Sequence, residues 1–274
     1  MATEMTLEEW DEQFSRQADW TRATRQYLYR RANLLRARRV LDVGSGTGVV
    51  TEELAASTEG EVIGLDIDPA MVAFARQRGR HPQKGISVKH AAQGGRAEYR
   101  QGDAHELPFP DGWFDVTACH FVLLWCRDPR RAAEEMMRVT RPGGAVLVCA
   151  EPDYGGRIDY PDLPIGRWQA EALRSEGADP LLGRKLRALF PAGHRFGSGT
   201  PQIEVGVIPG LWDLSTLRAE LDREWGLWMR SLAGIVPPDE LTRLRAADRA
   251  AIEAGERLVF MPVFYALIAN PGSL

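Results

Sequence analysis

The sequence predicts an α/β fold, in which a largely parallel β-sheet is covered by helices on both faces. Between Val40 and Glu151, short apolar segments alternate with amphipathic ones, as in strands joined by crossover helices. The strand-like segments are apolar almost throughout, which is typical of strands buried on both faces. A glycine-rich segment over 44–48 follows the first of them, where such sheets form ligand sites.

The order of elements up to residue 151 follows from periodicity and from signals at helix ends. Asp68-Pro69 and Asp128-Pro129 each open a helix, because aspartate caps a helix and proline fits its first position. The polar stretch over 81–96 is a loop without an assigned element. The expected elements are, in order, a helix over 6–35, a strand over 38–44, a helix over 48–57, a strand over 61–67, a helix over 68–78, a strand over 97–103, a strand within 114–125, a helix over 128–140 and a strand over 143–151.

After Glu151 the alternation ends and longer helices are expected. Pro262 lies inside the last strand, and a proline there predicts an edge position or a bulge. The two late strands would suit an antiparallel pair added at one end of the sheet. The elements expected here are a helix over 179–190 capped by Asp179, a strand over 201–210, a helix over 214–232, a helix after Pro238 and a strand over 256–271.

Composition and charge exclude several classes. The chain has 274 residues, 44% of them hydrophobic and 26% charged, as is ordinary for a globular protein. The net charge of −4 favours neither nucleic acid nor an anionic membrane, and no apolar run reaches the roughly 20 residues of a membrane span. The acidic N-terminus is not a signal peptide, and Cys119, Cys126 and Cys149 form no CxxC pair. We therefore expect a cytoplasmic protein with reduced, buried thiols, no metal site, and a monomeric or homodimeric state.

The glycine segment departs from the dinucleotide pattern. Gly44, Gly46 and Gly48 are spaced G-x-G-x-G, which lets a ligand approach the backbone closely. The dinucleotide fingerprint G-x-G-x-x-G/A needs a third small residue at position 49, where this sequence has Val49. A single glycine loop is weak evidence for any one cofactor, so other features must decide.

Two aspartates follow strands at the same edge of the expected sheet. Asp66 ends the second strand, and an acid there can accept hydrogen bonds from both ribose hydroxyls of any adenosine cofactor. Asp103 follows the third strand, and its acceptor-only carboxylate matches the exocyclic amino group of adenine. Local capping is the alternative role of each, although Asp68 already fits the cap of the next helix.

Four ordered segments together resemble the class I S-adenosylmethionine (SAM) dependent methyltransferases. They are "VLDVGSGTG", "VIGLDIDP", "GDAHELPFPDGWFD" and "RVTRPGGAVLV", and they are most similar to the subgroup near the ubiquinone and menaquinone biosynthesis methyltransferases. The resemblance covers roughly 36–150. It implies a Rossmann-like, doubly wound, seven-stranded mixed sheet whose last strand is antiparallel, with helical cap insertions. It also implies SAM as cofactor and S-adenosylhomocysteine as product.

The resemblance further implies roles for individual residues. Asp42 and the loop formed by Gly44, Ser45, Gly46 and Gly48 would line the methionine moiety. Asp66 would bind the ribose, Ile67 would pack on adenine, and Asp103 with Ala104 would meet the adenine edge. The cofactor's carboxylate calls for a cation, for which we expect Arg25 or its neighbour Arg22.

Catalytic candidates follow the fourth and fifth strands. His120 would border the cofactor and serve as a base, because its ordinary pKa lies near neutrality, with a structural histidine as the alternative. Glu151 and Tyr154 could orient or deprotonate an acceptor, or else close a loop. Several tryptophans in the expected cover favour an apolar or aromatic acceptor pocket: Trp20, Trp125, Trp168, Trp225 and Trp228.

We therefore expect a single methyltransferase domain that acts on a small, hydrophobic or aromatic molecule. Residues 1–35 would form an N-terminal helical cap, 36–151 the SAM-binding core, and 152–274 the remaining strands with a helical substrate cap. The alternatives are an NAD-dependent oxidoreductase, an RNA methyltransferase that uses the arginine-rich first helix, and a non-catalytic SAM-binding protein. No nucleic-acid partner is expected. In the methyltransferase subgroups that act on the amines of bases or of glutamine, an Asn/Asp-Pro-Pro-aromatic element follows the fourth strand, whereas this chain has His120-Phe121-Val122-Leu123 there. The net charge is also negative.

Overall fold

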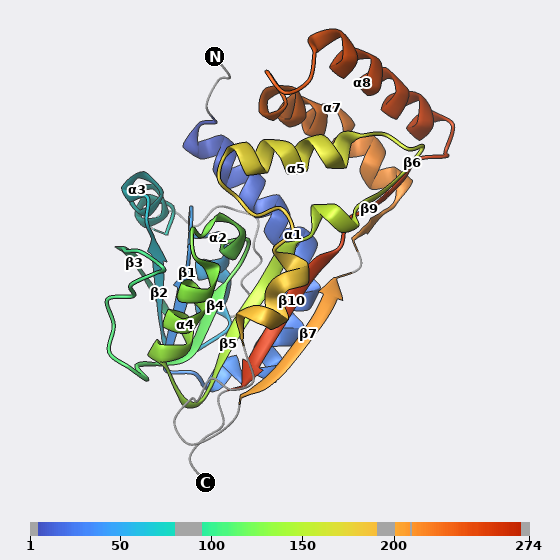
Figure 1. Cartoon of the computed structure of the whole chain (residues 1–274). Helices are drawn as coiled ribbons and strands as arrows, with labels where there is room; N and C mark the ends of the chain where they lie inside the picture. The colour runs from blue at the N-terminus through green and yellow to red at the C-terminus, as the bar shows by residue number, and fades with distance from the viewer. Residues whose placement is uncertain (1–4, 80–94, 191–200, 209, 270–274) are drawn as a thin grey trace.

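A computed structural model describes residues 5–79, 95–190, 201–208 and 210–269 (Figure 1). Its large sheet has seven strands in the order β3-β2-β1-β4-β5-β10-β7. The first five pair in parallel, and β10 runs antiparallel to both of its neighbours. The predicted mixed sheet is thus confirmed. Its strands are β1 (Arg39–Val43), β2 (Glu61–Asp66), β3 (Arg96–Gln101), β4 (Phe114–Cys119), β5 (Thr140–Pro152), β7 (Gln202–Ile208) and β10 (Val263–Ala269).

Helices cover both faces of this sheet. Alternate residues of β1 point to opposite sides, so Val40 packs with Leu28 and Leu54 in one hydrophobic cluster, whereas Leu41 packs with Met136 in another. The first cluster lies under α1 and α2, and the second under α4 and α6. The helices around the sheet are α1 (Leu7–Arg31), α2 (Val49–Ala56), α3 (Pro69–Arg78), α4 (Pro129–Val139) and α6 (Leu186–Leu189).

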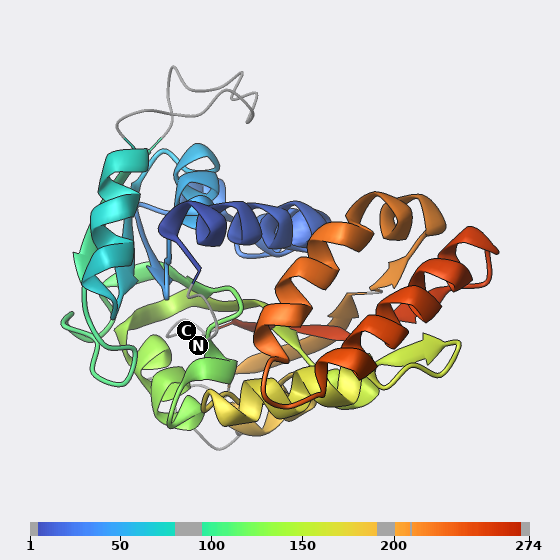
Figure 2. The same cartoon turned by 90° about the horizontal axis from the view of Figure 1, so that it is seen from above.

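A second layer of structure lies to one side of the sheet, at the upper right of Figure 1 and the right of Figure 2. A three-stranded antiparallel sheet in the order β6-β9-β8 joins three helices there. Trp225, fully buried, lies in the hydrophobic cluster that these helices share. We call this assembly the cap. Its elements are β6 (Ile158–Tyr160), α5 (Ile165–Ser175), β8 (Leu211–Trp212), α7 (Leu214–Ser231), α8 (Pro238–Glu253) and β9 (Leu258–Phe260).

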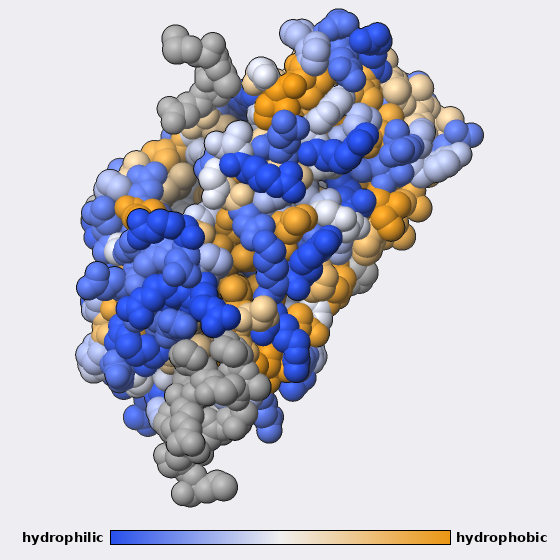
Figure 3. Space-filling model, in the orientation of Figure 1, coloured by the Kyte–Doolittle hydropathy of each residue, from blue (hydrophilic) through white to orange (hydrophobic). Residues whose placement is uncertain are grey.

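Part of the surface of the cap is apolar. Figure 3 shows apolar surface near β6 and β9. Exposed apolar residues of this small sheet include Ile158 of β6 and Leu211 of β8. Cys119 and Cys149 are buried and Cys126 is half-buried, and all three are free thiols. In the part of the chain that the structure describes, no helix is long and apolar enough to cross a membrane.

Three expectations about the C-terminal half were wrong. The strand expected over 256–271 is two strands in two different sheets, with Pro262 between them, because a residue without an N–H interrupts the ladder. The edge position given as one alternative for Pro262 is also wrong, since β10 lies between β5 and β7. The other alternative, a bulge, has a register shift nearby, between Phe264 and Ala266 in the pairing of β10 with β5. The helix expected over 179–190 is only a 3₁₀ turn (Gly183–Lys185) followed by α6.

Some elements were not expected, and one expectation is not tested. The sequence patterns did not indicate β6 or β8, whereas α5 falls within the part of the chain expected to form the helical cap. The loop expected over 81–96 lies almost entirely outside the described residues.

Candidate functional site

A cavity of about 620 Å³ opens at the carboxyl ends of β1, β2 and β4. We call it the first cavity. Its floor is the glycine loop, whose Gly44 and Ser45 amides both donate to the Leu65 carbonyl, at 2.7 and 3.0 Å. Gly46 has a φ of +51°, and a Cβ on it would lie 2.8 Å from the Phe14 ring. Only glycine combines this positive φ with the absence of a Cβ, so the predicted loop presents its backbone directly to the cavity. Gly48, also with positive φ, caps α2 and does not line the cavity.

Two carboxylates flank this loop. Asp66 accepts hydrogen bonds from the amides of Gly46 (2.7 Å) and Asp68 (3.0 Å), which ties the end of β2 to the glycine loop. Asp42, at the end of β1, is buried and accepts from Thr51 at 2.6 Å. Burial, helped by the nearby Asp66 charge, raises the pKa of Asp42 to about 7. Burial likewise raises the pKa of Asp66.

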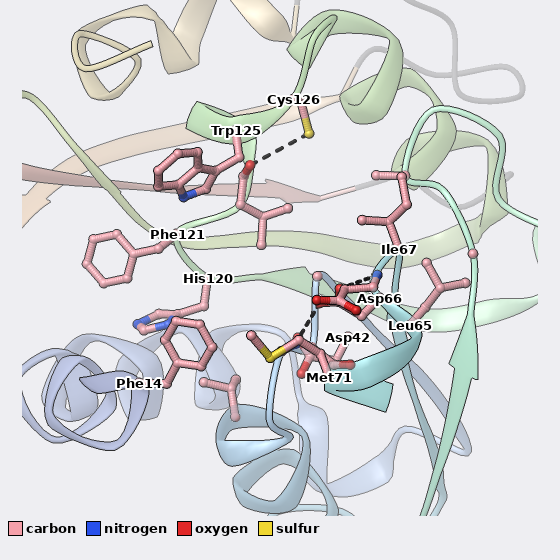
Figure 4. Close-up of a pocket in the computed structure, with 18 of the residues that line it drawn as sticks. Phe14, Asp42, Leu65, Asp66, Ile67, Met71, His120, Phe121, Trp125 and Cys126 are labelled. Atoms are coloured by element: carbon pink, nitrogen blue, oxygen red, sulfur yellow. Dashed lines mark hydrogen bonds between the residues drawn. The ribbon is translucent and has the colours of Figure 1, made fainter. Parts of the chain in front are cut away.

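The expected adenine residues also line the first cavity. Ile67 is 64% exposed, and it lies on the same side of the pocket as Met71 and Asp66 in Figure 4. Asp103 Oδ1 accepts from the His105 amide at 2.8 Å and lies 2.6 Å from His105 Nδ1, and these contacts lower the pKa of Asp103. Ala104 borders the cavity next to it. The side chains expected to contact adenosine therefore lie in one place.

His120 borders the same cavity from the end of β4. Its Nε2 lies 2.8 Å from Thr21 Oγ1 on α1, and Figure 4 shows its ring near Phe14 and Phe121. Burial of the ring, together with the nearby Arg25 guanidinium, lowers the pKa of His120 well below its usual value. The imidazole is therefore neutral at physiological pH.

The expected cation is not at the cavity. Arg25 is fully buried outside it and holds Glu53 with two hydrogen bonds of 3.0 and 2.5 Å, while Arg22 pairs with Asp19 on the surface. The expectation that either arginine lines the ligand site is contradicted, because both guanidinium groups pair with side chains of this chain. Among the described residues that line the first cavity there is no lysine or arginine; its charged residues are the carboxylates Asp42, Asp66, Asp68, Asp103 and Glu176.

A second cavity, of about 640 Å³, lies next to the first and extends under the cap. Gln17, Phe121 and Trp125 line both cavities and so mark where they meet. Phe121 has a φ of +56°, a strained conformation for a bulky residue that is typical of functional sites. Aromatic side chains form much of the wall: Trp20, Phe121, Trp125, Tyr154, Trp212 and Trp228.

The remaining expected residues are divided between this wall and the protein interior. Tyr154 lines the second cavity. Glu151 is fully buried, lines neither cavity, and accepts from the amides of Val122 (3.0 Å), Leu123 (2.7 Å) and Leu124 (3.2 Å). Burial raises the pKa of Glu151 to about 8, although the amide donors act in the other direction. The structure thus gives Glu151 a structural contact beneath the turn after β4, in place of the expected catalytic position.

Three residues of α1 that line the first cavity were not predicted from the sequence. Trp10, Phe14 and Gln17 line the first cavity, and their spacing of four and three residues places them on one helix face. The same spacing is typical of helix faces that pack on a core, so the sequence alone did not distinguish the two roles. Trp168 and Trp225 pack inside the cap and do not line the second cavity.

The part of the chain that contains the glycine loop is similar to known proteins. Residues 41–148 match a family described as a methyltransferase domain. An uncharacterized methyltransferase of Schizosaccharomyces pombe is 35% identical over 156 residues, which are 54% of this chain and 53% of that protein. The ubiquinone/menaquinone biosynthesis C-methyltransferase UbiE of Idiomarina loihiensis is 36% identical over 129 residues, 46% of this chain and 48% of that protein. The chain therefore spans about half the length of these curated relatives.

A solved structure extends the likeness in fold beyond the matched segment. It is the Haemonchus contortus phosphoethanolamine N-methyltransferase 2, in complex with phosphomonomethylethanolamine and S-adenosylhomocysteine. It superposes with a TM-score of 0.58 at 16% identity, over 94% of this chain and 57% of that chain. Together these matches confirm the resemblance and the Rossmann-like fold expected from the sequence.

Proposed function

We propose that the chain, through its methyltransferase domain, transfers the methyl group of SAM to a small, hydrophobic or aromatic molecule. The charge of the first cavity carries this proposal. Five carboxylates and no described lysine or arginine line it, so it suits a cationic ligand without phosphate. SAM carries a sulfonium, an ammonium group and one carboxylate, and so a single net positive charge, whereas the pyrophosphate of NAD would meet uncompensated negative charge.

The residues at the glycine loop fit this cofactor. Asp66 would accept the ribose hydroxyls, since a carboxylate has about four acceptor positions and the backbone amides occupy two of them. Ile67 would pack on the adenine ring, with Asp103 and Ala104 at its edge. Asp42 and the backbone of the loop, with Ser45, would border the methionine part.

The second cavity would hold the methyl acceptor. It meets the first at Gln17, Phe121 and Trp125, so an acceptor there would lie next to the cofactor. The sulfonium supplies an activated methyl group with a good leaving group. The aromatic wall would exclude water and orient an apolar ring system, while His120 and Tyr154 offer polar groups near the junction.

Calorimetric titration with SAM, S-adenosylhomocysteine and NAD tests the cofactor assignment. We expect binding of the first two and none of NAD. Asp66→Ala should weaken S-adenosylhomocysteine binding at least about tenfold, because hydrogen bonds to a charged group are lost. Asp239→Ala, an exposed aspartate on α8, is the matched control and should bind normally.

Binding of NAD in place of SAM would refute the proposal, as would normal binding by Asp66→Ala. A screen with methyl-labelled SAM should then compare aromatic acceptors with polar ones of similar size. Transfer only to the polar compounds would refute the proposed acceptor class.

A further inference from the structure

A chain of hydrogen bonds connects the buried arginine of α1 to His120. Arg25 holds Glu53 through Nε and Nη2, and its Nη1 donates to Thr21 Oγ1 at 2.5 Å. The Thr21 hydroxyl lies 2.6 Å from the Gln17 carbonyl, one turn earlier in the helix. The same hydroxyl lies 2.8 Å from His120 Nε2. Thr21 and Arg25 are both fully buried, so water does not compete for these contacts.

The chemistry of the partners fixes the direction of each hydrogen bond. The Gln17 carbonyl can only accept, so the single proton of the Thr21 hydroxyl points to it. The Arg25 guanidinium can only donate, so it occupies one lone pair of the Thr21 oxygen. The remaining contact must then use the second lone pair, and His120 Nε2 must carry the proton. A neutral His120 consequently has no proton on Nδ1.

Nδ1 of His120 is therefore free to accept a hydrogen bond, on a ring that borders the first cavity. No described residue donates to it, and the ring borders the first cavity close to Phe121, where the two cavities meet. The positive charge of Arg25 also disfavours a second proton on the ring, which keeps the imidazole neutral.

We propose that Thr21 and Arg25 are positioning residues that hold His120 as the Nε2–H tautomer, so that Nδ1 accepts a hydrogen bond from an O–H or N–H group of the methyl acceptor. This inference rests on the proposed function. As the acceptor's oxygen or nitrogen bonds to the methyl carbon, the carbon–sulfur bond breaks and its electron pair stays on sulfur. The acceptor's proton passes to His120 Nδ1 in the same step. The positive charge lost from sulfur then appears on the imidazole, so the net charge of the site is unchanged.

The tautomer can be read directly by ¹⁵N NMR of the full chain labelled at histidine, with S-adenosylhomocysteine, at neutral pH. The His120 signals are identified by their loss in His120→Gln. We expect a protonated Nε2 and an unprotonated Nδ1, kept in Thr21→Ser and replaced by mixed tautomers in Thr21→Val. Thr242→Val is the matched control, because the exposed Thr242 hydroxyl also donates to a carbonyl one turn earlier, at 2.8 Å.

A proton on Nδ1 in the unmodified protein would overturn the inference, and this result does not depend on whether Thr21→Val folds. An unchanged tautomer in a folded Thr21→Val would also overturn it. Failure of the proposed function gives a different result, since S-adenosylhomocysteine would then not bind while the tautomer of the free protein remains measurable.

A matched pair of ring compounds tests the role of Nδ1. 2-Naphthol carries a hydroxyl proton, and 2-methoxynaphthalene carries a methyl group in its place. With S-adenosylhomocysteine present, 2-naphthol should shift the Nδ1 signal and 2-methoxynaphthalene should not. Equal shifts with both, or no shift with 2-naphthol when calorimetry shows that it binds, would overturn the assigned role.

Discussion

Arg25→Met separates a structural role of this arginine from a direct role in cofactor binding. The guanidinium is fully buried and makes three hydrogen bonds, two to Glu53 and one to Thr21. Methionine keeps much of the side-chain volume and removes the charge and all three donors. Breaking a buried ion pair by removing one partner costs about 3–5 kcal/mol of the free energy of unfolding. Glu53 is 15% exposed and can regain some hydration, which places the expected loss at the lower end of that range.

Urea denaturation measures this loss directly. For a loss of about 3 kcal/mol, a thermal scan should show a decrease of roughly 6–12 °C in Tm, taking about 2–4 °C for each kcal/mol. The affinity for S-adenosylhomocysteine, measured well below the new Tm, should stay within about twofold, equivalent to roughly 0.4 kcal/mol. Arg22→Met is the matched control, because an exposed ion pair with Asp19 contributes about 0–1 kcal/mol.

The opposite pattern would refute this reasoning. If Arg25→Met were as stable as Arg22→Met but bound the cofactor product much more weakly, Arg25 would contact the ligand as the sequence first indicated. A double variant, Arg25→Met with Glu53→Met, should recover part of the lost stability, because no uncompensated charge then remains buried.

Three further predictions follow from the cavities and the cap. Gly46→Ala should lower the free energy of unfolding by about 1–2 kcal/mol, since alanine disfavours positive φ. It should also weaken cofactor binding in calorimetry, because the added Cβ pushes Phe14 into the first cavity, and unchanged affinity would contradict this. SAM should bind more weakly at about pH 6 than at about pH 8, because a cationic ligand favours ionised Asp42, whose pKa burial raises to about 7. The same raised pKa makes Asp42 lower the stability of the ligand-free protein as the pH rises from about 4 to about 7, and Asp42→Asn should abolish both effects. Trp225→Phe should cost about 1–3 kcal/mol in chemical denaturation, because Asp248 loses a buried donor at 2.7 Å, and a loss below about 0.5 kcal/mol would show that this bond contributes little.

The large sheet and its helices could be predicted because each sequence feature that indicates them is local. The helix caps at Asp68 and Asp128 both form as expected, since each carboxylate accepts a hydrogen bond from a backbone amide in the first turn of α3 or α4. The apolar strands and the glycine spacing each depend on a few neighbouring residues. Since parallel strands bring their carboxyl ends to one edge, locating Asp42, Asp66 and Asp103 at strand ends was enough to place them around one cavity.

The cap and the partners of charged side chains depend on contacts that are distant in sequence. Whether Arg25 faces a ligand or Glu53 is decided by the packing of α1 on α2, which no local pattern encodes. Pro262 was recognised as an interruption, but a proline does not indicate that the strands on its two sides join different sheets. Glu151 ends a strand as the other acids do, yet three amides of the neighbouring turn bind it inside the protein.

The position of α1 limits how this protein can be re-engineered. The helix contributes Gln17 to both cavities, and on its outer side Arg16 and Glu9 form ion pairs with Glu220 and Arg230 of α7. The second cavity, where we propose that the acceptor binds, is therefore not a module that ends at the boundary between core and cap. A chimera that exchanged only residues 152–274 would combine the cap of another protein with the α1 side of the second cavity from this chain. It would also lose the ion pairs between α1 and α7. If the second cavity holds the acceptor, as proposed, transplanting its specificity requires that the first helix move together with the cap.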